Sequence, residues 1–242
     1  MRFDVVTLSP ELFEPLDRFG VIGRALRDGR VRLKTWNLRD FASPPHWRVD
    51  DRPYGGGPGM VLMAEPLWRA VRAAREEAPA GAPVIYLSPQ GRRLDQRLVE
   101  ELAGHPGLIL VCGRFEGVDE RWVESQVDQE ISVGDFVMTG GEIPALMLLD
   151  AVSRLVPGTV GDEQSLVQES FQGGVLDAPV YTRPAEWRGH GVPAVLLGGH
   201  HGDIAAWRGT QGQERTERRR PDLVAPSPGS GSDTGPLGKD GK

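Results

Sequence analysis

The chain has 242 residues, 39% hydrophobic and 26% charged, which is an ordinary composition for a globular protein. No apolar run reaches the roughly 20 residues that span a bilayer, and the N-terminus has no apolar signal core, so the sequence predicts a cytoplasmic protein without a membrane segment. The single cysteine, Cys112, excludes an intramolecular disulfide, and the net charge of −6 argues against non-specific binding to nucleic acid.

Two basic clusters depart from this acidic balance. Residues 18–48 carry eight Lys and Arg residues against two Asp residues, and RTERRR at 215–220 is also basic. Charge runs usually form solvated helix faces. Two such clusters on an acidic protein also fit a surface that faces phosphates, and the sequence leaves this alternative open.

The first third of the chain alternates strand and helix patterns. Apolar and alternating runs predict strands at 2–8 and 31–38, and helical spacing predicts helices at 10–16, 21–29 and 65–78. HWRVDDRPYGGGPGM at 46–60 is predicted to be a loop, because its prolines and glycines fit neither period.

Residues 81–155 repeat one unit three times: a strand, a glycine-containing turn and a helix. This repeat predicts a parallel sheet with ligand chemistry at the carboxyl ends of its strands. Further along, 201–220 has a helical pattern, and the Pro/Gly/Ser-rich residues from Ala225 onward predict disorder. The predicted organisation is a main domain at 1–158, a mobile linker at 159–176, a small helical domain at 177–223 and a disordered tail at 224–242.

Three turns follow neighbouring predicted strands: YLSPQG at 86–91, CGRFEG at 112–117 and SVGDFVMTGG at 132–141. If these strands are adjacent, the turns meet in one pocket, where glycines let backbone approach a flat ligand and acidic residues suit a cation better than a phosphate. A flat base with a cation and no phosphate describes S-adenosylmethionine. The plain alternative is three ordinary left-handed turns in a Rossmann-like sheet.

Other cofactor classes are less well supported. The first strand is followed by SPELFEP without a glycine fingerprint, which disfavours NAD, and the chain contains no P-loop motif. His200, His201 and Asp203 form a weak candidate metal site and are more simply a surface histidine pair, so no metal is predicted.

Six long blocks resemble the bacterial tRNA (guanine-N1)-methyltransferase family over residues 1–223: DDRPYGGGPGM, YLSPQGRRLDQ, LILVCGRFEGVDER, ISVGDFVMTGGEIPA, VSRLVPG and LDAPVYTRP. The resemblance implies the SPOUT class, an α/β fold whose parallel sheet has helices on both faces and ends in a trefoil knot, with a small, mostly helical C-terminal domain. It also implies methyl transfer from S-adenosylmethionine to N1 of guanine 37 of tRNA when guanine 36 precedes it, by a homodimer whose active sites use both chains.

The resemblance also implies which residues bind and react. Glu169 and Arg154 are the expected catalytic residues, as general base at N1 and stabiliser of charge on O6. The expected tRNA-binding residues are His46, Asp50, Arg52, Gly57 and Gly59. The expected cofactor-binding residues are Tyr86, Leu87, Ser88, Pro89, Gln90, Gly113, Phe115, Glu116, Ser132, Val133, Gly134, Asp135, Phe136, Val137, Met138, Gly140, Gly141, Pro144 and Asp177.

Two positions depart from the family's pattern. Phe115 stands where the family often has a tyrosine, and Glu169 precedes Ser170 where the family has an aspartate. The plain alternatives are an exposed linker acid for Glu169, a helix-dipole partner for Arg154 and a surface loop for 50–60. Two rival functions also remain open: an RNA-binding module of SPOUT type without catalysis, and a Rossmann-type oxidoreductase.

Overall fold

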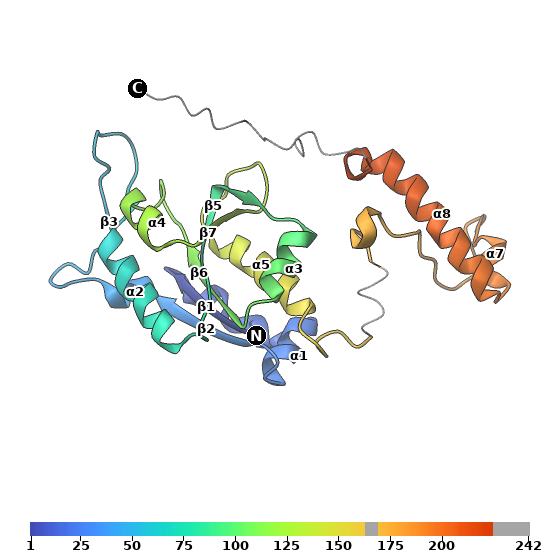
Figure 1. Ribbon diagram of the computed structural model, residues 1–242, viewed down its shortest axis with the longest axis horizontal. Helices are drawn as coiled ribbons and strands as arrows, with labels where there is room; N and C mark the ends of the chain where they lie inside the picture. The colour runs from blue at the N-terminus through green and yellow to red at the C-terminus, as the bar shows by residue number, and fades with distance from the viewer. Residues whose placement is uncertain (163–168, 225–242) are drawn as a thin grey trace, which may run out of the picture. The chain divides into compact units, whose positions relative to one another are not determined.

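The computed structural model of the chain describes residues 1–162 and 169–224. The chain divides into two compact units, Met1–Glu163 and Gln164–Lys242. The predictions of a mobile linker and a disordered tail fall partly on 163–168 and 225–242, which lie outside the described residues. Figure 1 shows the first unit as a layered α/β structure and the second as one long helix with short flanking elements.

The first unit is built on a five-stranded sheet in the order β2-β1-β6-β5-β7, in which every pairing is parallel. The strands are β1 Arg2–Thr7, β2 Arg32–Asn37, β5 Val84–Arg93, β6 Gly107–Cys112 and β7 Gln129–Ser132. The predicted parallel sheet is therefore confirmed, and β6, β5 and β7 are direct neighbours.

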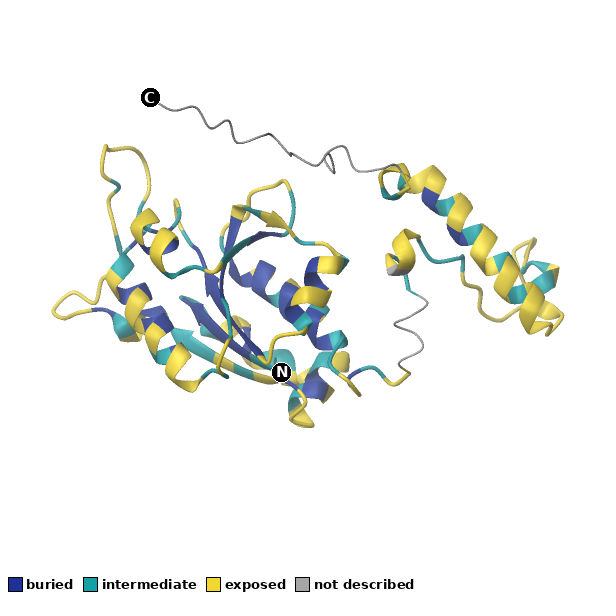
Figure 2. Cartoon of the chain, viewed as in Figure 1, coloured by how far each residue is buried: buried dark blue, intermediate teal, exposed yellow. Residues whose placement is uncertain are grey.

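Helices cover both faces of this sheet, as predicted. They are α1 Gly20–Arg27, α2 Ala64–Glu77, α3 Gln96–Ala103, α4 Glu120–Gln126 and α5 Glu142–Arg154. Helices α1, α3 and α5 share one hydrophobic core with one face of the sheet, and α2 and α4 share a second core with the other face. Figure 2 shows the central strands buried between these two layers, whereas edge strand β2 is partly exposed.

The period of two along the strands explains the two cores. In β6, Leu108 and Leu110 belong to the core with α3 and α5, whereas Ile109 and Val111 belong to the core with α2 and α4. All six residues of β6 are buried, so the strand reads as a continuous apolar run. Such runs are typical of central parallel strands with helices on both sides.

Short elements replace two of the predicted segments. The predicted helix at 10–16 is instead two 3-10 helices, η1 Pro10–Leu12 and η2 Glu14–Arg18, each with a proline at its start. Pro15 would lie inside a continuous helix at 10–16, where it lacks the N–H that an α-helix needs. The predicted loop at 46–60 contains a two-residue strand, β3 Asp50–Asp51, which pairs with β4 Val61–Leu62. A third 3-10 helix, η3, spans Leu38–Phe41.

The second unit has less regular structure, although the predicted helix at 201–220 is confirmed as α8 His201–Arg219. Its other elements are η4 Gln172–Gly174, β8 Glu186–Trp187, β9 His190–Gly191, α7 Ala194–Leu197 and η5 Pro221–Leu223. Segment 175–178 packs on α8, because the Leu176 N–H donates to Thr216 Oγ1 at 2.8 Å. A Cβ on Gly212 would lie 2.8 Å from the Leu176 carbonyl oxygen, so glycine permits this contact.

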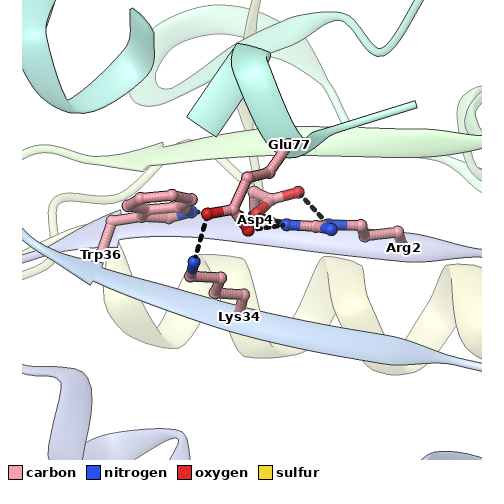
Figure 3. A network of polar contacts seen from close by, with 5 residues as sticks. All are labelled: Arg2, Asp4, Lys34, Trp36 and Glu77. Carbon is pink, nitrogen blue, oxygen red and sulfur yellow. Dashed lines mark hydrogen bonds and ion pairs between the residues drawn. The ribbon is translucent and has the colours of Figure 1, made fainter. Parts of the chain in front are cut away.

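A polar network around the buried Asp4 carboxylate joins the first two strands to the end of α2 (Figure 3). The Asp4 carboxylate is inaccessible and accepts hydrogen bonds from the Arg2 guanidinium at 2.8 Å and from Trp36 Nε1 at 2.9 Å. Glu77 accepts from Arg2 at 3.2 Å and from Lys34 at 2.7 Å. The hydrogen bond to Asp4 raises the pKa of Arg2, and the hydrogen bonds from Lys34 and Arg2 lower the pKa of Glu77.

We expect Asp4→Ala to destabilise the first unit by about 2–3 kcal/mol, because it leaves the Arg2 guanidinium and the Trp36 N–H without their buried acceptor. Urea denaturation would measure the change. Asp17→Ala is the matched control, since the Asp17 carboxylate is exposed and lies 3.9 Å from Arg18. Equal midpoints for the two variants would show that the network contributes nothing to stability.

Candidate active site

A cavity of 330 Å³ opens at the carboxyl ends of β6, β5 and β7. Its walls are formed by residues 86–90 of β5, by 113–118 after β6 and by 130–134 and 136–141 around the end of β7, and Pro144 of α5 also lines it. The three strands are parallel neighbours, so their ends lie at one edge of the sheet. The predicted convergence of the three turns is therefore confirmed.

Most of the predicted cofactor residues line this cavity. Asp135 does not line it, and Asp177 belongs to the second unit. The predicted residues that do line it are Tyr86, Leu87, Ser88, Pro89, Gln90, Gly113, Phe115, Glu116, Ser132, Val133, Gly134, Phe136, Val137, Met138, Gly140, Gly141 and Pro144. Three charged residues that were not predicted from the sequence also line the cavity: Arg114, Glu120 and Glu130. Arg114 lies in the block CGRFEG, and its positive charge within a predicted binding turn was the signal in the sequence.

The first predicted turn, 86–91, lies within a longer strand. Strand β5 continues to Arg93, and Ile131 of β7 pairs with both Leu87 and Arg92. The intervening residues 88–91 leave the ladder as a bulge beside the cavity. Pro89 cannot donate to the ladder, which explains the interruption, and pairing resumes after Gly91.

The glycines of the turns have a packing role in the structure, and their close approach to a ligand stays a prediction. A Cβ on Gly113 would lie 2.9 Å from the Tyr86 ring, and one on Gly141 would lie 2.7 Å from the Cys112 Cα. A Cβ on Gly140 would lie 2.6 Å from both Arg114 Nε and Glu142 Oε2. Glycine is therefore required because the turns pack against each other and against β6.

A buried carboxylate beside the cavity connects three segments of the chain, of which the one with Arg114 lines the cavity. Glu142, in the first turn of α5, is 2% exposed and accepts a hydrogen bond from Thr7 Oγ1 at 2.9 Å. Its carboxylate also pairs with Arg114 Nε at 3.0 Å. The Arg114 guanidinium reaches Ser9 Oγ at 3.4 Å. The ends of β1 and β6 and the start of α5 are thereby held together.

Exposed apolar side chains surround the cavity. Phe115, Phe136 and Val137 line it and are 53%, 55% and 86% exposed. Phe115 also has a φ of +61°, which a non-glycine residue rarely adopts. Apolar surface and backbone strain of this kind are typical of sites that a ligand or another chain covers.

Two ionisable groups near the cavity remain protonated at neutral pH. Burial, with the nearby charges of Glu130 and Glu120, raises the pKa of Tyr86 to about 12. Burial, with the charge of Glu142, raises the pKa of the Cys112 thiol. Tyr86 can therefore act as a hydrogen-bond donor, and Cys112 is a small buried apolar residue rather than a nucleophile.

The loop at 46–60, which is rich in glycine, lies against one wall of this cavity. The Glu116 N–H donates to the Met60 carbonyl at 3.0 Å, and a Cβ on Gly59 would collide with the Glu116 side chain. Of the predicted tRNA residues, Asp50 is half-buried in β3, and His46, Arg52, Gly57 and Gly59 are exposed. The loop therefore presents polar groups and backbone next to the cavity.

Comparison with known proteins matches residues 1–226 to the family model of tRNA (Guanine-1)-methyltransferase TrmD. A tRNA (guanine-N(1)-)-methyltransferase of Shewanella amazonensis is 57% identical, over 92% of this chain and 89% of the relative. Proteins of that name from Leptothrix cholodnii and Methylococcus capsulatus are each 55% identical, over 93% of this chain and 91% and 90% of the relatives. The chain belongs to this methyltransferase family.

Neither of the two predicted catalytic residues of this methyltransferase lines the cavity. Arg154 belongs to the first unit and Glu169 to the second. Arg154 is the last residue of α5, about 18 Å along the helix from Glu142 at the cavity, given 1.5 Å per residue. Glu169 belongs to the second unit, where it lines a groove with Asp177. The Asp177 N–H donates to Ser170 Oγ at 3.1 Å, which keeps these two segments together.

The residues that the structure describes contain no group of three His, Cys, Asp or Glu side chains placed to hold a metal ion. In the same residues, no helix combines the length and the apolar character needed to cross a membrane.

We expect an absorbance titration of the three tyrosines to contain one phenol that ionises at about 12, and Tyr86→Phe to remove it. Between the ordinary value of 10.0 and about 12, the unfolded chain loses this proton while the folded chain keeps it, so the free energy of unfolding falls as pH rises. Tyr86→Phe should flatten that fall, and Tyr181→Phe should not. A titration unchanged by Tyr86→Phe would contradict the assignment.

Proposed function

We propose that the chain transfers a methyl group from S-adenosylmethionine to N1 of guanine 37 of tRNA, beside the anticodon, and that it does so in the cytoplasm as a homodimer. The observation that carries this proposal is that the bulge within β5 and the turns after β6 and β7 line one cavity. Membership of the methyltransferase family supports the reaction class and the tRNA substrate.

The cavity suits this methyl donor. Leu87, Val133, Met138 and Pro144 provide apolar surface for a purine, and backbone groups at the strand ends can bind its edge. Glu116, Glu120 and Glu130 add negative charge near a ligand that carries a sulfonium. A nucleotide phosphate would meet repulsion from these carboxylates.

The proposed chemistry needs a base and a cation at the guanine. Guanine N1 holds a proton at neutral pH, so a carboxylate must accept it while the methyl group is attacked, and a cation must stabilise the charge that grows on O6. We assign these roles to Glu169 and Arg154. The remaining groups hold the two reactants in line.

The position of Arg154 supports a site made from two chains. In one chain, α5 carries Arg154 about 18 Å away from the cavity. A second copy, arranged so that the Arg154 end of its α5 approaches the cavity, would supply the missing cation. The exposed apolar residues around the cavity then become interface residues.

We further propose the family's trefoil knot. After edge strand β7, the chain returns past β5: the Gly141 N–H donates to the Gly113 carbonyl at 2.9 Å, and α5 then packs on β6 and β1. Such a return across the sheet is what threading requires.

We also propose that the second unit binds tRNA.

Mass spectrometry of a tRNA transcript incubated with the protein and S-adenosylmethionine tests the proposal. The expected product carries one methyl group at N1 of guanine 37, and a transcript with adenine at this position should remain unmodified. Tight tRNA binding without any methylation would instead indicate the RNA-binding module.

We expect Glu169→Gln to lower kcat about 10²–10⁴-fold, the range for loss of a general base, with little change in S-adenosylmethionine affinity. Glu169→Asp, which keeps the carboxylate, should retain much of the activity. Glu217→Gln makes the same chemical change on the exposed face of α8 and serves as control. Single-turnover methylation at the wild-type rate by Glu169→Gln would exclude it as the base.

Mixing Arg154→Ala chains with Glu169→Ala chains tests whether one site uses both chains. If Arg154 and Glu169 of one site come from different subunits, some mixed dimers contain one intact site and should regain part of the activity. Each parent homodimer should remain inactive. Absence of recovery, with subunit exchange confirmed by differential tagging, would exclude the divided site.

A further inference from the structure

The proposed methyl donor carries three charges: a positive sulfonium, a positive α-ammonium and a negative α-carboxylate. A site that is rich in carboxylates attracts the two cations and repels the α-carboxylate. The donor therefore requires a cation within the same cavity, and the inference below rests on the proposed function.

Arg114 is the one cationic side chain among the described residues that line the cavity. The other charged lining residues are Glu116, Glu120 and Glu130. One cation and several carboxylates thus match a ligand with one anionic and two cationic groups. The other charged residues predicted from the main domain do not line this cavity: Asp50, Arg52, Asp135 and Arg154.

The guanidinium of Arg114 is held in place and keeps donors for a ligand. Nε pairs with the buried Glu142 carboxylate at 3.0 Å, and Nη2 reaches Ser9 Oγ at 3.4 Å. An arginine has five N–H donors, so these contacts leave others for a planar carboxylate. The side chain is 27% exposed, which gives a ligand access to it.

The first turn of helix α5 lies beside Arg114. Helix α5 starts here with Gly141 as its N-cap and no side-chain cap, and the first N–H groups of a helix have no intrahelical acceptor. Gly140, which lines the cavity, lies so close that a Cβ would sit 2.6 Å from Arg114 Nε. The guanidinium therefore lies directly against the turn that faces the ligand.

We propose that Arg114 binds the α-carboxylate of the methyl donor. Glu142 and Thr7 are positioning residues: Thr7 holds the Glu142 carboxylate, and Glu142 fixes the orientation of the guanidinium. Glu116, Glu120 and Glu130 face the cationic part of the donor. The cavity thereby distinguishes the complete donor from analogues that lack the carboxylate.

Calorimetry with two ligands tests this inference on the unaltered protein. Decarboxylated S-adenosylmethionine keeps the sulfonium and the ammonium and lacks only the carboxylate. We expect wild type to bind it roughly 10–100-fold more weakly than S-adenosylmethionine, which is the range for a charge-assisted hydrogen-bonded pair. Equal affinities for the two ligands would overturn the inference.

The same pair of ligands then tests the residue. Arg114→Gln should reduce the affinity ratio to about one by weakening only S-adenosylmethionine, and Arg114→Lys should restore part of the ratio. Arg121→Gln is the matched control, because Arg121 is 78% exposed on α4 and pairs with Asp119. A wild-type ratio in Arg114→Gln would overturn the assignment.

Binding of 5′-methylthioadenosine, which lacks both the carboxylate and the ammonium, reports whether the cavity is intact. Arg114→Gln should bind it as wild type does. If removal of the cation alone disrupts the fold, the double variant Arg114→Gln/Glu142→Gln removes both charges and should also show a ratio of about one; a ratio retained there would overturn the inference. Failure of wild type to bind any of these ligands would contradict the proposed function itself.

Discussion

The contact between the turn after β6 and the start of α5 is the constraint on which the candidate site depends. The Gly141 N–H donates to the Gly113 carbonyl at 2.9 Å, and no Cβ fits between Gly141 and Cys112. This close approach brings Glu142 within reach of Arg114 and Thr7. A wider turn would separate these groups and leave the Glu142 carboxylate buried without a partner, at a cost of several kcal/mol.

The arrangement of the sheet was predictable because its physical cause is local. A central strand such as 107–112 is apolar at every position, and strand, turn and helix repeat in regular order through residues 81–155. The 3-10 helices at 10–18 and the bulge at 88–91 were not predicted, since prolines interrupt a pattern without specifying what replaces it. Pairing of β5 after the bulge depends on β7, almost 40 residues further along the chain.

The sequence predicted which backbone segments form the candidate site better than it predicted which charged side chains pair there. Glycine turns after neighbouring strands indicate convergence, and most of the predicted lining residues meet in the cavity. Arg114 and Glu142 were not identified as a pair, because 28 positions separate them and only the fold brings them together. Asp135 belongs to a lining segment but does not line the cavity, and sequence proximity alone could not reveal this.

The groups assigned to the proposed reaction belong to two units: the first unit contains the cavity, and the second contains the proposed base. The donor cavity is built from buried parallel strands and tightly packed turns, so its polar groups need little reorganisation when a ligand binds. The proposed base, Glu169, belongs to the other unit, after residues 163–168. In the proposed reaction, a methyl donor held in the first unit thus depends on a base that the second unit carries. In that reaction guanine N1 gives up its proton as it attacks the methyl group, so methyl transfer requires the guanine, the proposed base and the donor together.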